Sequence, residues 1–114
     1  MGVMRDCVFC RRVNSKQFDD IDTWTVSFTP LSPVVPGHKL FVSRDHLEDA
    51  SVDPFATGKV FETASMYAFY KMQPFNLITS AGPEATQTIK HLHIHYVPRA
   101  AGDGLHLPWT GQHD

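Results

Sequence analysis

Apolar and polar residues alternate with a period of two in "TWTVSFT" (23–29) and in "TIKHLHIHYV" (88–97). Because successive side chains of a strand point to opposite faces of a sheet, this alternation predicts a strand in each segment. Two shorter apolar segments, residues 38–43 and 75–80, predict two further strands.

The segments between these strands carry the residues of turns and loops. We expect a polar loop at "NSKQFDDID" (14–22) and an irregular connection at the proline-rich "PLSPVVPG" (30–37). A turn is expected at "AGPEAT" (81–86), and the chain after Pro98 has a loop-like composition.

A helical period replaces the alternation between residues 53 and 72. Asp53 can cap this helix with Pro54 at its first position, and the helix must end before Pro74. The apolar residues near helical spacing are Phe55, Val60, Phe61, Ala64, Tyr67 and Ala68. Strands, one main helix and further strands, in that order, predict an α+β fold with an antiparallel sheet.

The strand at 88–97 contains three histidines at every second position. The alternation predicts that His91, His93 and His95 share one face of the sheet. The opposite face would carry the apolar side chains of Leu92, Ile94 and Tyr96. Because imidazole can be a nucleophile, a proton carrier or a metal ligand near neutral pH, the three rings can divide these tasks in one pocket.

The turn before this strand supplies neutral hydrogen-bond donors. These are the backbone amides after Gly82, the amide of Gln87 and the hydroxyl of Thr88, which together can hold an anionic phosphorus centre. The residues alone leave two other interpretations open, an exposed strand face and an adventitious metal chelate.

Length and charge narrow the class of protein. A chain of 114 residues suits one domain, here residues 1–114, and its 42% hydrophobic and 19% charged residues are typical of a globular fold. The net charge of −2, with scattered cations, gives no footprint for nucleic acid. No apolar run is long enough to span a membrane, and "MGVMRDCVFC" does not resemble a signal peptide, so we expect a cytoplasmic protein.

The two cysteines of the chain, Cys7 and Cys10, are separated by two residues. This spacing lets both sulfurs reach one tetrahedral metal ion, but a redox pair has the same spacing. From the spacing alone both interpretations stay open.

Three stretches of the chain resemble one protein family. The segment "HLHIHYV" fits the signature of the histidine triad (HIT) family, and "GPEATQTIKHLHIHYVPRAAGD" is similar to its fragile-histidine-triad branch. The segment "PVVPGH" (33–38) also resembles that branch, and the similarity covers about residues 7–104. It implies a HIT-like fold with a sheet of about five strands, a homodimer, and hydrolysis or transfer of nucleoside monophosphates from phosphoanhydrides or phosphoramidates.

The resemblance also implies roles for individual residues. His93 would be the nucleophile that forms a nucleotidyl-histidine, His95 would bind phosphate and orient His93, and His38 would support both. The residues that would contact the substrate are Ser80, Thr86, Gln87, Thr88 and His95. One position departs from the family: Pro30 stands where an acidic residue or Asn usually binds the ribose hydroxyls.

The family resemblance extends to a metal site. Several bacterial members carry a CxxC motif whose zinc ion is completed by a downstream histidine and by the first histidine of the triad. This implies a structural zinc ion bound by Cys7, Cys10, His46 and His91. Two other functions remain as alternatives, a nucleotide-binding module without turnover and a metal-binding or redox protein.

Overall fold

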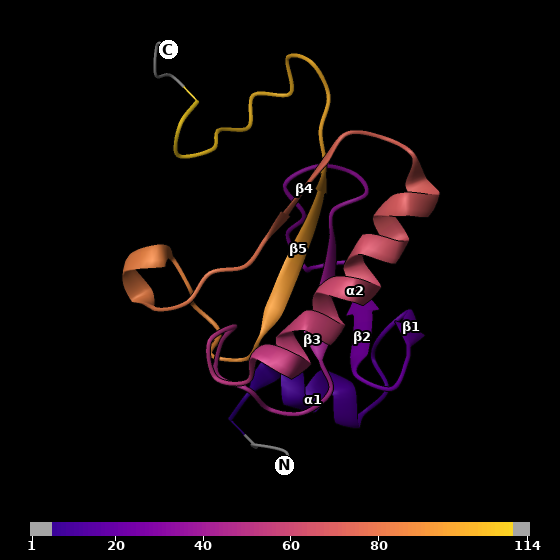
Figure 1. The fold of residues 1–114 in the computed structure, drawn as a ribbon, viewed down its shortest axis with the longest axis vertical. Coiled ribbons are helices and arrows are strands. Elements are labelled where there is room, and N and C mark those ends of the chain that lie inside the picture. Colours follow the sequence, from indigo (N-terminus) through magenta and orange to yellow (C-terminus); the bar gives the residue numbers. More distant parts are fainter. Residues whose placement is uncertain (1–5, 111–114) are drawn as a thin grey trace.

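The structure, a computed structural model, describes residues 6–110 and contains one five-stranded sheet with two α-helices. The elements in chain order are α1 (Val8–Asn14), β1 (Asp20–Ile21), β2 (Thr25–Phe28), β3 (Lys39–Ser43), α2 (Pro54–Lys71), β4 (Phe75–Ile78), the 3₁₀ turn η1 (Pro83–Ala85) and β5 (His93–Pro98). Figure 1 shows α2 lying across the sheet.

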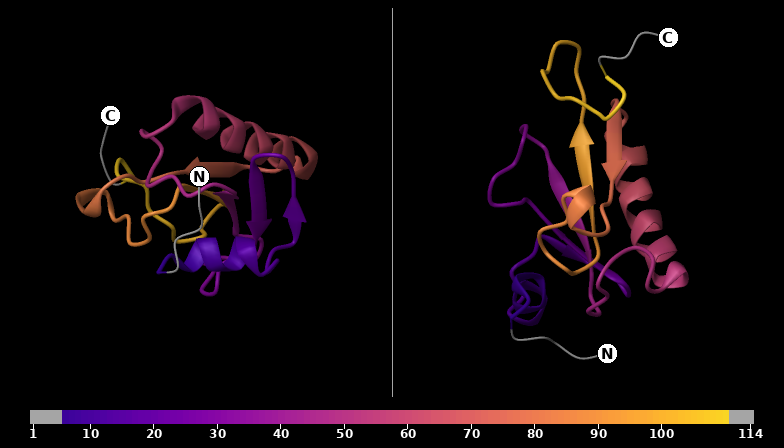
Figure 2. Two further views of the ribbon diagram at one scale, coloured as in Figure 1. Left: turned by 90° about the horizontal axis from the view of Figure 1, so that it is seen from below. Right: turned by 90° about the vertical axis from the view of Figure 1, so that its left-hand side faces the viewer.

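The sheet has the strand order β1-β2-β3-β5-β4, and each pair of neighbouring strands is antiparallel. The long helix α2 covers one face, and the short helix α1 lies on the other side, as Figure 2 shows. This confirms the predicted α+β fold with an antiparallel sheet and one main helix. Among the described residues, no helix has the length and apolar character needed to cross a membrane.

The helix α2 begins and ends where the sequence predicts. The Asp53 side chain accepts a hydrogen bond from the Ala56 amide at 3.1 Å, and Pro54 occupies the first turn. The helix ends at Lys71, and the C-cap residue Met72 adopts the left-handed conformation (φ 53°). A cap and a proline at the start therefore locate this helix without help from packing.

The two faces of the sheet bury separate apolar clusters. On the α2 side, the buried cluster is Phe41, Leu47, Ala56, Val60, Ala64, Ala68, Leu92, Ile94 and Tyr96. On the α1 side, it is Phe9, Val26, Phe28, Leu40 and Val42. Because side chains of β5 alternate, Ile94 and Tyr96 belong to the α2 side and leave His93 and His95 on the α1 side.

The structure corrects three sequence-based expectations. Strand β5 begins at His93 and not at Thr88, so His91 lies before the strand. The fully buried His91 bonds through its ring to the Ser43 carbonyl, and its amide bonds to the Ile89 carbonyl, a local turn that interrupts the extended backbone. The prediction that the three histidine rings share the face of one continuous strand is therefore wrong.

The other two corrections concern the first quarter of the chain. The segment expected as a loop (14–22) contains the short strand β1, which pairs with β2 through its backbone and needs no apolar pattern. Helix α1 was not expected, because its seven residues show little periodicity. It is capped by the Cys7 sulfur, which accepts a hydrogen bond from the Cys10 amide at 3.3 Å.

Candidate active site and metal centre

Two histidines lie on β5, an interior strand of the sheet between β3 and the edge strand β4. In the register of β5 with β3, His93 pairs with Val42 and His95 pairs with Leu40. Hydrogen bonds on both sides of β5, to β3 and to β4, hold the backbone that carries the two rings. The two ring centroids are 5.2 Å apart.

The two rings line a cavity of about 280 Å³. Six predicted site residues surround it: His38, Ser80, Thr86, Gln87, His93 and His95. The seventh, Thr88, does not line it, and instead borders a separate hollow with Cys7 and His46. The structure thus brings together most of the predicted substrate site from four separate segments of the chain.

The hydrogen bond of His93 determines which ring nitrogen is available for chemistry. Its Nδ1 lies 2.6 Å from the His91 carbonyl oxygen. Since a carbonyl can only accept, Nδ1 carries the proton and Nε2 of the neutral ring keeps its lone pair. Burial lowers the pKa of His93, which favours this neutral form.

A second chain of hydrogen bonds assigns the tautomers of His38 and His95. The Val34 amide donates to Nδ1 of His38 at 3.1 Å, so the proton of neutral His38 is on Nε2. This Nε2–H lies 2.9 Å from Nδ1 of His95 and donates to it. The proton of neutral His95 is therefore on Nε2, where it is a hydrogen-bond donor.

Burial also fixes the charge of this pair. The pKa of His95 is lowered to about 4 by burial and then by the neighbouring His93 and His38. Burial likewise lowers the pKa of His38. Both rings are therefore neutral at pH 7, as the chain of hydrogen bonds requires.

The turn before β5 is shaped by Gln87. Its side-chain oxygen accepts a hydrogen bond from the Gly82 amide at 2.9 Å, and its amide nitrogen donates to the Glu48 carbonyl at 2.7 Å. Gly82 (φ 91°) and Thr86 (φ 68°), on either side of η1, both have a positive φ, and Thr86 adopts the left-handed helical conformation. Gln87 thus closes the turn in addition to lining the cavity.

The outer wall of the cavity includes residues that the sequence did not assign. Arg99 donates to Asn76 at 2.6 Å and to the two carboxylate oxygens of Asp103 at 2.8 and 3.1 Å. It also donates to the Leu105 carbonyl at 2.9 Å, which holds the tail against β4 and β5. The exposed His106 also lines the cavity, from this tail. The i,i+4 spacing of Arg99 and Asp103 is the one sequence signal for this wall.

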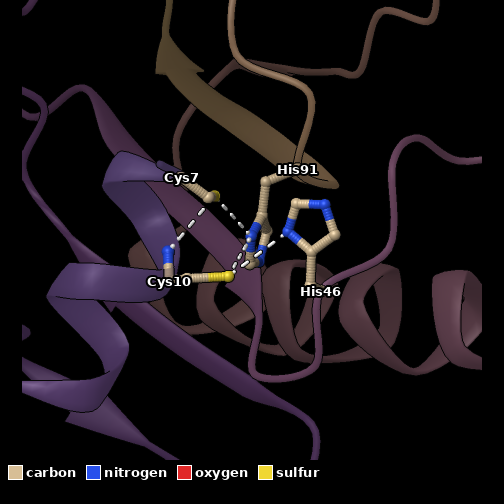
Figure 3. Close-up of side chains that lie close together, drawn as sticks. All are labelled: Cys7, Cys10, His46 and His91. Atoms are coloured by element: carbon tan, nitrogen blue, oxygen red, sulfur yellow. Dashed lines mark hydrogen bonds between the residues drawn. The ribbon is translucent and has the colours of Figure 1, made fainter. Parts of the chain in front are cut away.

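The candidate metal ligands meet at the other end of the histidine segment, as Figure 3 shows. Cys7 and Cys10 project from the start of α1, His46 from the loop after β3, and His91 from the segment before β5. One ligand atom of each residue lies within 4.8 Å of those of the other three.

The distances in this cluster fit a tetrahedral zinc ion. Nδ1 of His91 lies 3.2 Å from the Cys7 sulfur and 3.5 Å from the Cys10 sulfur, and Nδ1 of His46 lies 3.2 Å from the Cys10 sulfur. Zinc–sulfur and zinc–nitrogen bonds of about 2.3 and 2.0 Å at tetrahedral angles give about 3.5 Å between sulfur and nitrogen. These four residues can therefore hold a metal ion, with two sulfur and two nitrogen ligands.

A further contact orients the most buried ligand. Nε2 of His91 lies 2.7 Å from the Ser43 carbonyl and must donate to it, so Nδ1 directs its lone pair toward the sulfurs. The pKa of His91 is lowered to about 4, mainly by burial, so the ring is neutral at pH 7. A neutral imidazole is the form that binds metal. The sequence gives no signal for Ser43, because its backbone carbonyl makes this contact.

Comparison with known proteins finds a matching family model and several similar proteins. The family model described as "HIT domain" matches residues 16–102. The adenosine 5'-monophosphoramidase of Saccharomyces cerevisiae is 28% identical over 113 residues, covering 93% of this chain and 71% of the relative. The bis(5'-adenosyl)-triphosphatase of the same species is 33% identical over 115 residues, covering 80% of this chain but 55% of that protein.

Solved structures share the fold. A Streptococcus mutans protein has a TM-score of 0.85 and 27% identity, covering 100% of this chain and 78% of that chain. A zinc-bound histidine triad family protein from Mycobacterium smegmatis has a TM-score of 0.77 and 26% identity, covering 89% of this chain and 80% of that chain.

Proposed function

Because this chain belongs to the HIT domain family, we propose that it hydrolyses or transfers the nucleoside monophosphate of a phosphoramidate or phosphoanhydride substrate. Nucleotide hydrolases among its relatives support this reaction class, since two carry the names adenosine 5'-monophosphoramidase and bis(5'-adenosyl)-triphosphatase. The proposal treats residues 1–114 as one HIT domain, of which the structure describes 6–110. The cytoplasmic location stays a prediction from the sequence.

The observation that carries the proposal is the hydrogen bond from His93 Nδ1 to the His91 carbonyl at 2.6 Å. It leaves Nε2 as the nucleophilic atom of a ring that lines the cavity. The Nε2 lone pair attacks the α-phosphorus, an N–P bond forms, and the bond from phosphorus to the leaving nitrogen or oxygen breaks. The leaving group departs with that electron pair and takes up a proton.

Water completes the reaction in a second step. Its oxygen attacks the phosphorus of the nucleotidyl-histidine, the N–P bond breaks, the electron pair returns to His93 Nε2, and the proton lost by the water passes to solvent. The His91 carbonyl stabilises the positive charge that His93 carries while it is bonded to phosphorus, because it accepts the Nδ1 proton throughout.

The neighbouring groups in the cavity would bind the phosphate. His95 presents Nε2–H as a donor, since its Nδ1 accepts from His38 at 2.9 Å. Ser80, Thr86 and Gln87 line the same cavity, and the hydroxyl of Ser80 would be a further neutral donor. Both side-chain N–H groups of Gln87 already donate to the Glu48 and Ile89 carbonyls, so Gln87 would shape the phosphate site rather than donate to it. Neutral donors suit a phosphorus centre whose negative charge grows during attack.

We assign a structural zinc ion to Cys7, Cys10, His46 and His91, supported by the fit of their ligand atoms and by the zinc-bound relative. Such an ion ties the first helix to the rest of the fold. Four protein ligands leave no position for a substrate or a water molecule, so the reaction steps above use none of it.

We also propose that two copies of the chain associate. The side chains that α2 and the start of β4 leave exposed include large apolar groups: Phe55, Met66, Phe69, Tyr70, Met72 and Phe75. Strand β4 is an edge of the sheet, with β5 as its one partner among the described residues. An apolar helix face beside an open edge favours a second copy of this chain, which sedimentation measurements can detect.

The direct test is capture of the covalent intermediate. Adenosine 5'-phosphoramidate labelled in its phosphorus is mixed with the protein, quenched, and analysed for label on His93 by mass spectrometry. Label at this residue together with AMP release supports the proposal. Nucleotide binding without label or release would instead support the non-catalytic alternative.

A further inference from the structure

Phe9 occupies a position between the metal cluster and the proposed nucleophile. Its side chain is 5% exposed, and α1 directs it toward the sheet. The Phe9 ring centroid lies 5.0 Å from that of His93, with the two ring planes 76° apart. It also lies 5.9 Å from the His91 ring and 5.7 Å from the Phe28 ring.

The hydrogen bond to His91 does not by itself fix the His93 ring. One contact at Nδ1 defines a direction, but the torsion that turns an imidazole plane has a broad energy minimum. An aromatic ring packed against the imidazole at a steep angle restricts this torsion, because the energy of an edge-to-face contact depends on orientation. The second ring against His93 is His95, with planes 66° apart.

We propose that Phe9 is a positioning residue that holds the His93 imidazole in the orientation needed for attack, an inference that rests on the proposed role of His93 as nucleophile. Phe9 lies between Cys7 and Cys10 in the chain, on the first turn of α1. A metal ion bound by these two sulfurs therefore also fixes the place of the Phe9 ring.

The hydrogen bond and one of the two ring contacts on His93 thus come from the segments that carry the candidate metal ligands. The carbonyl that accepts the Nδ1 proton belongs to His91, and the ring that packs on His93 is flanked by the two cysteines. The CxxC segment therefore orients the His93 ring, in addition to stabilising the fold.

The test replaces Phe9 by leucine in the full chain loaded with zinc, with Phe41→Leu as the matched control. Phe41 is 2% exposed and packs on the α2 side against Tyr67, away from the histidines of the cavity. Both variants lose the same ring from a buried site. The measurements are kcat and KM for adenosine 5'-phosphoramidate, the Kd of AMP, zinc content and melting temperature.

We expect Phe9→Leu to lower kcat by roughly tenfold to a hundredfold, because misplacing a reacting group has effects of this size. KM and the Kd of AMP should stay within about threefold, because the phosphate donors do not change. Zinc content should stay at the wild-type value, and Phe41→Leu should lower the melting temperature while keeping wild-type kcat. Phe9→Tyr, which keeps the ring, should recover most of the rate.

Three results would overturn the inference. Wild-type kcat in Phe9→Leu would show that the ring contact has no catalytic effect, and equal loss of kcat in both leucine variants would show a general effect of core packing. A rise in KM with unchanged kcat would place Phe9 in substrate binding. A wild-type protein without turnover would overturn the proposed function itself, which this design detects separately.

Discussion

The candidate metal cluster and the candidate substrate cavity lie at opposite ends of the five-residue segment 91–95. Both contain histidine side chains, but in different surroundings. At the first end, His91 is 0% exposed and both ring nitrogens have fixed partners, the Ser43 carbonyl and the sulfurs. At the other end, His93 and His95 are only partly buried and line a cavity of about 280 Å³.

The difference between the two ends follows from the backbone. His91 precedes the strand, in a turn that directs its ring into the interior beside α1. His93 and His95 belong to the strand, and their alternation places them together on one face. Identical residues two positions apart therefore lie in a closed cluster of metal-ligand atoms or in an open cavity, according to where the strand begins.

The largest effect is expected at the cavity end, where a substitution should change activity and leave stability intact. His93→Ala should lower kcat by at least about a thousandfold, because it removes the nucleophile, while the melting temperature stays close to that of the wild type. Apolar contacts of this strand come from Ile94 and Tyr96 on the other face, which supports an intact fold. Steady-state kinetics and a thermal melt check both halves of this prediction.

His106→Ala is the matched control for that variant, since it removes an exposed histidine from the wall of the same cavity. It should retain turnover. Near-normal kinetics in His93→Ala would disprove the nucleophile assignment.

The second effect concerns the stability of the metal end. Removal of zinc by a chelator should lower the melting temperature by roughly 10 °C or more, because binding energy at a site absent from the unfolded chain is folding energy. Cys10→Ser should lower the melting temperature in the same way and make it insensitive to chelator. Elemental analysis of protein purified without chelators should give one zinc ion per chain.

An effect of intermediate size, a change of folding stability with pH, is expected from His95 in the cavity. The pKa of His95 is about 4 in the folded protein, against an ordinary value of 6.5. Between these values the unfolded chain binds a proton that the folded chain does not, so stability is complete above about pH 6.5 and falls as the pH drops toward 4. His95→Asn should flatten this part of the stability curve.

Urea unfolding of the wild type and of His95→Asn at several pH values measures this difference. The two proteins share every other residue, so the difference between their curves isolates His95 and the two rings packed on it, His93 and His38. Parallel curves for the two proteins would contradict the assigned burial of His95.

The smallest effect is expected for the sugar of the substrate. At the position where the family resemblance implies a ribose-binding residue, Pro30 offers no side-chain acceptor, so a deoxyribose leaves no polar group of that residue unpaired. The ratio of kcat/KM for adenosine and deoxyadenosine phosphoramidates should stay below about a hundredfold, roughly 2.7 kcal/mol. A larger ratio would mean that another residue binds the sugar.

The sequence predicts those parts of this molecule that local chemistry determines. Asp53 and Pro54 locate the start of α2, and the alternation around Ile94 locates strand β5 and its faces. The metal ligands follow from family resemblance together with spacing. Each of these signals lies within a few neighbouring residues or within a known motif.

The rest depends on contacts between distant segments, which leave no local pattern. The break before His93 arises from a bond between the His91 ring and the carbonyl of Ser43, 48 residues away. The contact of Phe9 with His93 requires α1 to dock under the sheet. Backbone carbonyls and ring contacts of this kind cannot be inferred from residue types.

The position of β5 between β3 and β4 has a consequence for folding. His38 and His95, which share a hydrogen bond, are 57 residues apart in the chain, and α2 lies between them in sequence. Pairing of β3 with β5 therefore closes a long loop, a slow event compared with formation of α2 or of the β2–β3 pair. Amide protons around His93 and Tyr96 should exchange with solvent only through global unfolding, and recovery of activity during refolding should follow this strand pairing and not the earlier gain of helix.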